Sequence, residues 1–356
     1  MIAPLVVAQP RVLLVDLSQG REAAAGAADK ILHEGPFSVM LKDRAPTSGD
    51  KHDYMSQAPY FWPDPKSPNG LPYLRRDGER NPESNKITDH ANMDRVSRDT
   101  RTLAVAYHFT HDENYAARAA LLLRAWFIDA ETRMNPNLRY AQAIPGVNDG
   151  RGIGIIESRG LAGVVDAAGL LAGSKSWTAE DEKSLEKWFA DFLKWLQTSK
   201  NGTDESKATN NHGTFYDVQI ADFALFTGQR ELAVHTLQEA KTKRIAAQVQ
   251  PDGRQPRETE RTRGLSYSVM NLDGMMQLAQ LAKGVDIDLW NFQTPDGRGI
   301  RKALDWLVPF VMGEAKWPYQ QIDQFHPAEF IPLLERAAAA YHDDRYHALA
   351  VRLEKK

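Results

Sequence analysis

The stretch TNNHGTFYDVQIADFALF, residues 209–226, opens with amide, imidazole and phenol side chains and continues into an apolar run at helical spacing. Because apolar residues that recur at three- and four-residue steps form one face of a helix, we expect a helix over 212–226. The glycine in the following TGQRE supplies a stop signal. The sequence therefore predicts a helix that presents hydrogen-bonding chemistry at its first turn.

Segments of this kind follow one another along most of the chain, whereas strand-like alternation of apolar and polar residues is nearly missing. Start signals support several of them; Thr178, three residues before Asp181, resembles a capping box. Together, periodicity and start signals predict helices at 91–107, 113–129, 158–172, 178–197, 212–226, 229–247, 266–283, 298–312, 327–341 and 344–355.

The connections between these helices alternate in length. Gaps of about five residues or fewer alternate with long polar loops, and the gap at 284–297 is the exception. In a chain of antiparallel helix pairs, alternate helices begin at the same end, so the long loops should share one rim. We therefore expect an all-α fold, an incomplete (α/α) toroid of about five helix pairs. Its rim should be formed by the loops 52–90, 131–157, 200–211, 250–265 and 313–326.

An open solenoid is the alternative architecture, but no fixed-period sequence repeat supports it. We treat residues 1–356 as a single toroid domain whose first part, 1–90, is irregular. Long ordered loops on a rigid scaffold usually carry function, so the rim is where we look for a site.

Composition narrows the classes of function. The 356-residue chain has a formal net charge of −3, which offers no overall attraction to nucleic acid, and it has no cysteine for disulfides or thiolate chemistry. No apolar run approaches the roughly 20 residues that span a bilayer. Gly150, Gly152 and Gly154 do not complete a dinucleotide-binding motif, and no strand precedes them. We expect no cofactor and no metal.

The first residues, MIAPLVVAQP, contain a short apolar run interrupted by proline and lack a basic start. They do not form a complete signal peptide, although they could be the edge of one that is removed. We expect a periplasmic or secreted protein, and a cytoplasmic location stays open.

Reactive side chains gather at the starts of two neighbouring inner helices. Asn210 and Asn211 precede His212, and Tyr267 begins the next inner helix; both starts should lie on the same rim. Such a set suits β-elimination on a 4-linked polyuronate. In that reaction donors neutralise the C6 carboxylate, a base removes the C5 proton and an acid protonates O4. Amide and imidazolium donors fit the first task.

Arg261 and Arg263 precede Tyr267. A tyrosine with an ordinary pKa of about 10 is a poor base at neutral pH, but a nearby arginine and a helix N-terminus both favour the phenolate. Each residue also has a structural interpretation, because Asn or His at a helix start is usually a cap and a lone Tyr there usually packs. The placement of all these residues on one rim favours a catalytic interpretation over a structural one.

Three blocks of sequence resemble the alginate lyase superfamily with an (α/α) toroid fold. They are QAPYFWPDPKSPNGLPYLRRDGERNPE at 57–83, NNHGTFYD at 210–217 and ERTRGLSYS at 260–268. The chain is most similar to polysaccharide lyase family 38 and more distantly similar to the family 5 alginate lyases. The resemblance runs from about Tyr54 to about Leu281.

This resemblance implies roles for individual residues. Asn211 and His212 would bind and neutralise the uronate carboxylate, and Tyr267 would serve as both base and acid. An arginine would stand beside the tyrosine, and we favour Arg261 over Arg263.

Other residues fit a sugar cleft less specifically. Tyr60 and Trp62 stand in a stiff, proline-bearing segment suited to stacking on pyranose rings, although packing of the loop explains them equally well. The rim arginines could hold further carboxylates or be solvated charges. The remaining substrate-binding candidates are Asn210, Arg263, Arg75, Arg76, Arg151, Arg159 and Tyr216.

Two other functions stay open. A glycoside hydrolase on the same toroid needs two carboxyl groups roughly 5 to 10 Å apart. Its candidates are Asp217, Glu157, Glu258 and Glu260. A non-catalytic polysaccharide-binding protein needs only the aromatic and arginine surfaces. In every case the expected partner is an anionic polysaccharide or oligosaccharide, with no nucleic acid and no membrane. Neither the uronate, among mannuronate, glucuronate and guluronate, nor the oligomeric state follows from the sequence.

Overall fold

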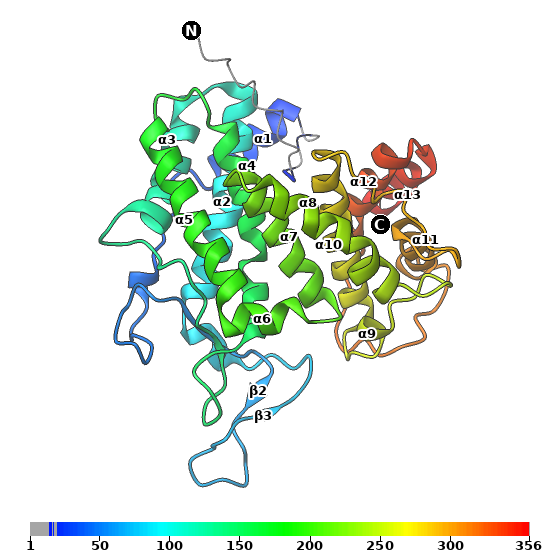
Figure 1. The fold of residues 1–356 in the computed structure, drawn as a ribbon, viewed down its shortest axis with the longest axis horizontal. Coiled ribbons are helices and arrows are strands. Elements are labelled where there is room, and N and C mark those ends of the chain that lie inside the picture. Colours follow the sequence, from blue (N-terminus) through cyan, green and yellow to red (C-terminus); the bar gives the residue numbers. More distant parts are fainter. Residues whose placement is uncertain (1–13, 16, 18–19, 356) are drawn as a thin grey trace.

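The computed structural model describes residues 14, 15, 17 and 20–355, and the segment MIAPLVVAQP lies outside them. Helices dominate the molecule (Figure 1). The α-helices are α1 (Gly20–Asp29), α2 (Asp89–Thr110), α3 (Glu113–Leu123), α4 (Ala162–Leu170), α5 (Ala179–Thr198), α6 (Lys200–Ser206), α7 (Asn211–Phe226), α8 (Arg230–Ala240), α9 (Pro256–Thr259), α10 (Gly264–Lys283), α11 (Ile300–Val311), α12 (Ile331–Tyr341) and α13 (Asp344–Glu354).

Shorter elements complete the chain. Strand β1 (Met55–Gln57) pairs in parallel with β4 (Tyr140–Ala143), and β2 (Phe61–Trp62) pairs antiparallel with β3 (Leu74–Arg75). The 3₁₀ segments are η1 (Val39–Leu41), η2 (Pro82–Lys86), η4 (Gly152–Leu161) and η6 (Pro327–Phe330), and the π-helical segments are η3 (Arg124–Ile128) and η5 (Lys241–Ala246).

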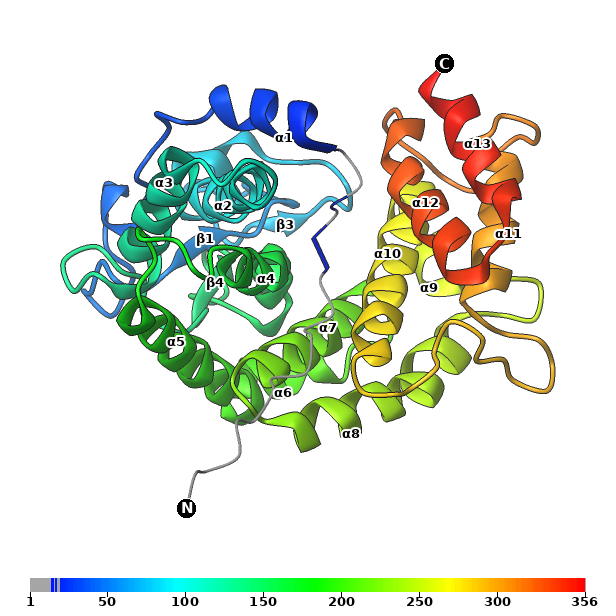
Figure 2. The same ribbon diagram turned by 90° about the horizontal axis from the view of Figure 1, so that it is seen from above.

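The helices form an incomplete (α/α) toroid, as predicted. Helix α2 packs on α3, α7 on α8, α10 on α11, and α12 on α13, while α4 and α5 both pack on α7. Seen from above, these pairs follow a curved path from α2 and α3, through α7 and α8, to α12 and α13 (Figure 2). Among the described residues, no helix combines the length and the apolar character needed to cross a membrane.

Three helices lie where the sequence predicted none, and one of them is the four-residue α9 in the loop predicted at 250–265. Helix α1 falls in the region expected to be irregular; it packs on α2 through small residues, Ala24 and Ala28, which give a weak apolar signal. Helix α6 falls in the loop predicted at 200–211. It is short and polar, and the Ser199 side chain caps it by accepting a hydrogen bond from the backbone of Gly202. Helices α1 and α6 are short and contain no large apolar side chain, so the sequence pattern did not indicate them.

The hydrophobic core consists of two clusters that meet at α7. Phe223 of α7 belongs to the cluster built on α2 to α5, together with Phe189. Val218 of the same helix belongs to the cluster built on α10 to α13, together with Leu304. Since α7 is buried on nearly all sides, it holds the two parts of the toroid in one fixed relation.

Hydrogen bonds join the loops that were predicted to share a rim. Pairing of β1 with β4 connects the first two loops, and Asn201 Nδ2 donates to the carbonyl of Arg139 over 3.4 Å. Across the molecule, Thr262 Oγ1 donates to the carbonyl of Asp77 over 3.0 Å, and the Ile322 amide donates to the Thr262 carbonyl over 3.0 Å. The prediction of one loop-bearing rim is confirmed.

A buried ion pair fixes the approach to α7. Arg244 Nε lies 2.6 Å from Asp217 Oδ2, and the same guanidinium donates to the carbonyls of Ser206 and Ala208 over 2.9 and 2.6 Å. Burial raises the pKa of the Asp217 carboxyl, and Arg244 opposes the shift. Asp217, a candidate acid for hydrolysis, is thus committed to a structural contact beneath the rim.

We predict that Asp217→Asn lowers the free energy of unfolding by about 3–5 kcal/mol, because it leaves the Arg244 charge buried without a counter-charge. Chemical denaturation measures this. The matched control is Asp191→Asn, which breaks an exposed pair with Lys187 and should change stability by about 1 kcal/mol or less. Equal effects of the two substitutions would contradict the structural role of the buried pair.

Candidate active site

The start of α7 is tied to α9 through Asn211. Glu258 of α9 and Asn211 are each 1% exposed. Both carboxylate oxygens accept a hydrogen bond from Asn211, one from its backbone N–H at 2.6 Å and one from Nδ2 at 2.7 Å. Burial raises the pKa of Glu258 to about 7, against the effect of these hydrogen bonds. The amide of Asn211 thus has a fixed orientation at the rim and one Nδ2 hydrogen left over.

His212 is oriented by a second buried carboxylate. Its Nδ1 lies 2.7 Å from Oε1 of Glu205 on α6, and the side chain of Glu205 is 2% exposed against 16% for His212. A carboxylate partner favours the proton on Nδ1, which leaves Nε2 for a ligand. Glu205 was not among the residues predicted from the sequence, where its position seven residues before His212 was the only available signal.

Tyr267 lies in the first turn of α10, against groups from the N-terminal loop and from the stretch directly before α10. Its hydroxyl is 2.7 Å from the hydroxyl of Tyr60. The guanidinium carbon of Arg261 lies 4.2 Å from the centre of the Tyr267 ring, whereas that of Arg263 lies 6.0 Å away. Arg261 is therefore the nearer of the two cations that the sequence offered.

Burial and the neighbouring arginines act in opposite directions on the pKa of Tyr267. Burial raises the pKa of Tyr267, and the Tyr60 hydroxyl raises it further; Arg261 and Arg263 lower it by less. The two arginines thus favour the phenolate, as expected, but burial, which the sequence did not reveal, outweighs them.

Arg261 is held by a carboxylate from the opposite side of the toroid. Its Nε and Nη2 donate to the two carboxylate oxygens of Asp77 over 3.0 and 2.9 Å, and Arg75 adds a third contact at 2.7 Å. Despite burial, which acts in the other direction, these contacts hold the pKa of Asp77 well below its usual range. Asp77 was not among the predicted residues.

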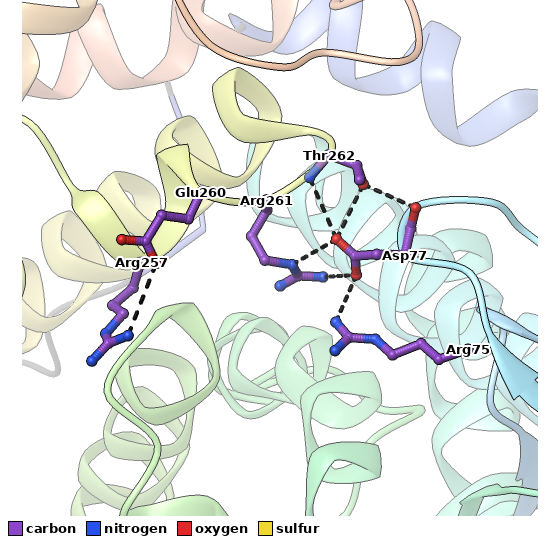
Figure 3. Close-up of a pocket in the computed structure, with 6 residues that line it drawn as sticks. All are labelled: Arg75, Asp77, Arg257, Glu260, Arg261 and Thr262. Atoms are coloured by element: carbon purple, nitrogen blue, oxygen red, sulfur yellow. Dashed lines mark hydrogen bonds and ion pairs between the residues drawn. The ribbon is translucent and has the colours of Figure 1, made fainter.

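A pocket of about 530 Å³ opens beside this contact (Figure 3). Arg75 and Arg261 converge on Asp77 at one side, and Arg257 and Glu260 lie at the other. Its lining residues are Arg75, Asp77, Arg257, Glu260, Arg261 and Thr262.

Several predicted substrate-binding residues have protein partners. Arg263 pairs with Asp323 at 2.7 Å. Trp62 Nε1 donates to the carbonyl of Glu79, and Arg76 lies over the Trp62 ring at 5.2 Å. These contacts occupy one edge and one face of the indole.

Three further predicted residues lie at or near α7 and η4. Arg159 Nη1 donates to the carbonyl of Ile156. Asn210 is the N-cap residue of α7 but makes no capping hydrogen bond through its side chain. Tyr216 requires correction: it is buried in the first core cluster, and its hydroxyl donates to the Leu196 carbonyl over 3.0 Å. It packs the helix and does not line the rim.

The carboxylates proposed for a hydrolase are already engaged. Glu258 accepts from Asn211, and Glu157 accepts hydrogen bonds from Tyr54 and Ser56 over 2.7 and 2.6 Å. Glu260 forms an ion pair with Arg257, three residues earlier. The arrangement provides donors and phenols around the rim and no free pair of carboxyl groups among the described candidates.

The toroid and this rim of amide, imidazole, phenol and guanidinium groups define a polysaccharide lyase of the (α/α) toroid class. The family model described as alginate lyase matches residues 38–317, so the chain belongs to the alginate lyase family. The resemblance noted in the sequence is thereby confirmed.

Solved structures agree with this assignment. An alginate lyase from Bacteroides ovatus superposes with a TM-score of 0.90 at 42% identity, covering 94% of this chain and 89% of that one. Alginate lyase A1-III, as a histidine-to-alanine variant, superposes with a TM-score of 0.60 at 16% identity, covering 94% and 91%; this shows a shared fold. A search of curated proteins gives no match.

We predict that Glu258→Gln changes how stability depends on pH. From about pH 4.5 to about pH 7 the folded protein holds a proton on Glu258 that the unfolded chain releases. Stability from this group therefore falls as pH rises, by about 1.4 kcal/mol per pH unit. Urea unfolding between pH 5 and pH 7 should show that slope in the difference between wild type and variant.

The same comparison removes the contribution of a second group. Burial also raises the pKa of Asp89, to about 6, but Asp89 is present in both proteins and cancels in the difference. Parallel stability curves for wild type and Glu258→Gln would show that Glu258 ionises normally in the fold.

Proposed function

We propose that this lyase cleaves a 4-linked polyuronate of the mannuronate or glucuronate type by β-elimination, leaving a 4,5-unsaturated uronate end. The observation that carries the proposal is the setting of Tyr267: its ring lies under the Arg261 guanidinium at 4.2 Å, and its hydroxyl contacts Tyr60 at 2.7 Å. A phenol in such a place can exchange a proton with a ligand and is shielded from bulk water.

In the proposed reaction, His212 and Asn211 hold the C6 carboxylate. Their support is the pair of buried carboxylates, Glu205 and Glu258, that orient the two side chains. Donors fixed before the substrate arrives stabilise the charge that develops on the carboxylate as the C5 proton leaves, because they need no reorganisation.

Tyr267 carries the proton in both directions. As a phenolate it takes the C5 proton; the C4–O4 bond then breaks, and the new phenol gives its proton to O4, which regenerates the phenolate. Arg261 lowers the free energy of the phenolate form through its charge. One group on one face serves both steps when H5 and O4 are syn, as in mannuronate and glucuronate.

Guluronate has the opposite configuration at C5, so its proton and leaving group lie on opposite faces. His212 would then have to act as the base. Ultraviolet absorbance during incubation with mannuronan, glucuronan and guluronan separates these cases, since each cleavage creates a conjugated double bond.

The comparisons support the substrate class. The Bacteroides ovatus protein is an alginate lyase, and two variants of A1-III, one His-to-Ala and one Tyr-to-Phe, were solved with a tetrasaccharide. A long anionic polymer is also met outside the cytoplasm, and we propose a periplasmic or secreted location on that ground.

We predict that kcat/KM on mannuronan rises with pH through the neutral and mildly alkaline range. Because burial and Tyr60 raise the pKa of Tyr267, the phenolate is a small fraction that grows about tenfold per pH unit. Initial rates at low substrate concentration measure the slope. A flat profile between pH 7 and pH 9 would exclude Tyr267 as a base that must first ionise.

We predict that Tyr267→Phe lowers kcat by at least roughly 10² to 10⁴, because it removes base and acid together while the ring and cleft stay in place. Ultraviolet assays give the rate, and calorimetry should give an oligosaccharide affinity near that of wild type. The matched control is Tyr341→Phe at the end of α12, whose hydroxyl donates to the Trp290 carbonyl. If Tyr267→Phe formed unsaturated product at a near wild-type rate, the proposed mechanism would be wrong.

A further inference from the structure

Arg151 is a partly buried cation whose direct contacts are with neutral groups. It takes part in no ion pair within 4.0 Å among the described residues. Its Nε and Nη2 donate instead to Gln142, to the backbone carbonyl at 3.2 Å and to Oε1 at 2.8 Å, and its guanidinium lies over the Phe61 ring at 5.0 Å. Gln142 uses two of the five N–H donors of the guanidinium, so others remain for a further partner.

The backbone around Arg151 is held between two elements. A side chain at Gly150 would meet the Arg139 carbonyl oxygen at 2.0 Å, and one at Gly152 would meet the Asn201 carbonyl oxygen of α6 at 2.6 Å. Only glycine allows this approach on both sides. Gly150 and Gly152 therefore allow the backbone at Arg151 to pack closely between the start of β4 and α6. Helix α6 also carries Glu205.

Gln142 is itself constrained. It is 6% exposed and has a φ of 50°, a left-handed conformation that non-glycine residues seldom adopt. Its backbone N–H donates to Ser56 Oγ at 2.7 Å, and Ser56 in turn donates to the buried Glu157 at 2.6 Å. Strain of this kind persists where the surroundings determine it, and it is concentrated at functional sites.

The charged groups around Arg151 place it at the rim. Burial and the nearby Arg75 lower the pKa of Arg151, while Glu157 and Glu205 oppose this effect. Glu205 is the carboxylate that holds His212, and Arg75 lines the pocket beside Arg261. Arg151 thus faces the same rim as the proposed catalytic groups but comes from a different segment.

We propose that Arg151, positioned by Gln142 and Phe61, is a carboxylate-binding subsite for a uronate next to the one that loses its proton. This inference rests on the proposed function. The carboxylate takes the donors that Gln142 leaves unused, and Phe61 keeps the guanidinium plane fixed. The contact serves binding of a polymer whose every unit is charged, and it takes no part in proton transfer.

The direct test is binding of a mannuronate tetrasaccharide, measured by calorimetry in a Tyr267→Phe background. Arg151→Gln should weaken the Kd roughly ten- to a hundredfold, as expected for a lost charge-assisted contact. Gln142→Ala should weaken it about three- to tenfold, since the charge stays but the orientation is lost. Arg352→Gln makes the same charge change on α13, where Arg352 pairs with Glu314, and should leave the Kd unchanged.

Kinetics distinguish a binding role from a catalytic one. In the enzyme with Tyr267 intact, Arg151→Gln should raise KM by a factor similar to the change in Kd, while kcat changes by less than about threefold. A loss of kcat with an unchanged Kd would overturn the subsite, and so would an unchanged Kd in Arg151→Gln. If that variant fails to fold, Arg151→Lys and Gln142→Ala decide: wild-type Kd values in both overturn the proposal.

Failure of the proposed function would be separately visible. A wild-type protein that makes no ultraviolet-absorbing product refutes the elimination, whereas the effect of Arg151→Gln on tetrasaccharide binding would still support the subsite. Normal lyase activity with no effect of the Arg151 variants refutes the subsite alone.

Discussion

The two hydrogen bonds between the buried carboxylate of Glu258 and Asn211 fix the geometry on which the rest of the site depends. Removing a carboxyl group from water is unfavourable unless donors meet its oxygens, so α9 and the start of α7 can pack in only this way. Helix α9 is followed within a few residues by α10, which carries Tyr267. Fixing α9 against α7 therefore also sets where Tyr267 lies relative to His212.

The N-terminal segment completes this arrangement from the other side of the toroid. Asp77 accepts hydrogen bonds from Nε and Nη2 of Arg261, and Tyr60 contacts Tyr267. These contacts join parts of the chain that belong to different core clusters, so they depend on α7 keeping those clusters in register. The proposed proton-transfer group thus lies where the N-terminal segment meets the start of α10, and small shifts of either would change its surroundings.

Local sequence was sufficient for most of the fold. The helices follow from apolar periodicity, and the shared rim follows from the alternation of loop lengths; the capping box of Thr178 and Asp181 is present as predicted. Apolar periodicity and loop lengths do not predict which polar side chains form hydrogen bonds with each other. Glu205 lies on a short polar helix without an apolar period, and nothing in its neighbourhood identifies His212 as its partner.

Burial was the other quantity that the sequence did not supply. Because α7 is buried on nearly all sides, spacing could not tell whether Tyr216 faced the rim or the core, and it faces the core. The pKa of Tyr267 depends on burial in the same way: the arginine neighbours were recognised from the sequence, but the effect of burial on the pKa exceeds theirs.

The pairing of the rim arginines limits how strongly charge alone attracts a polyuronate. Arg261 and Arg263 each have a carboxylate partner, so their net contribution to the distant field is small. A guanidinium has five N–H donors, however, and a bidentate pair uses only two. The acidic partners therefore act mainly to orient donors toward a ligand. Under the proposed function, recognition of the uronate then depends on short-range hydrogen bonds in fixed directions more than on long-range attraction.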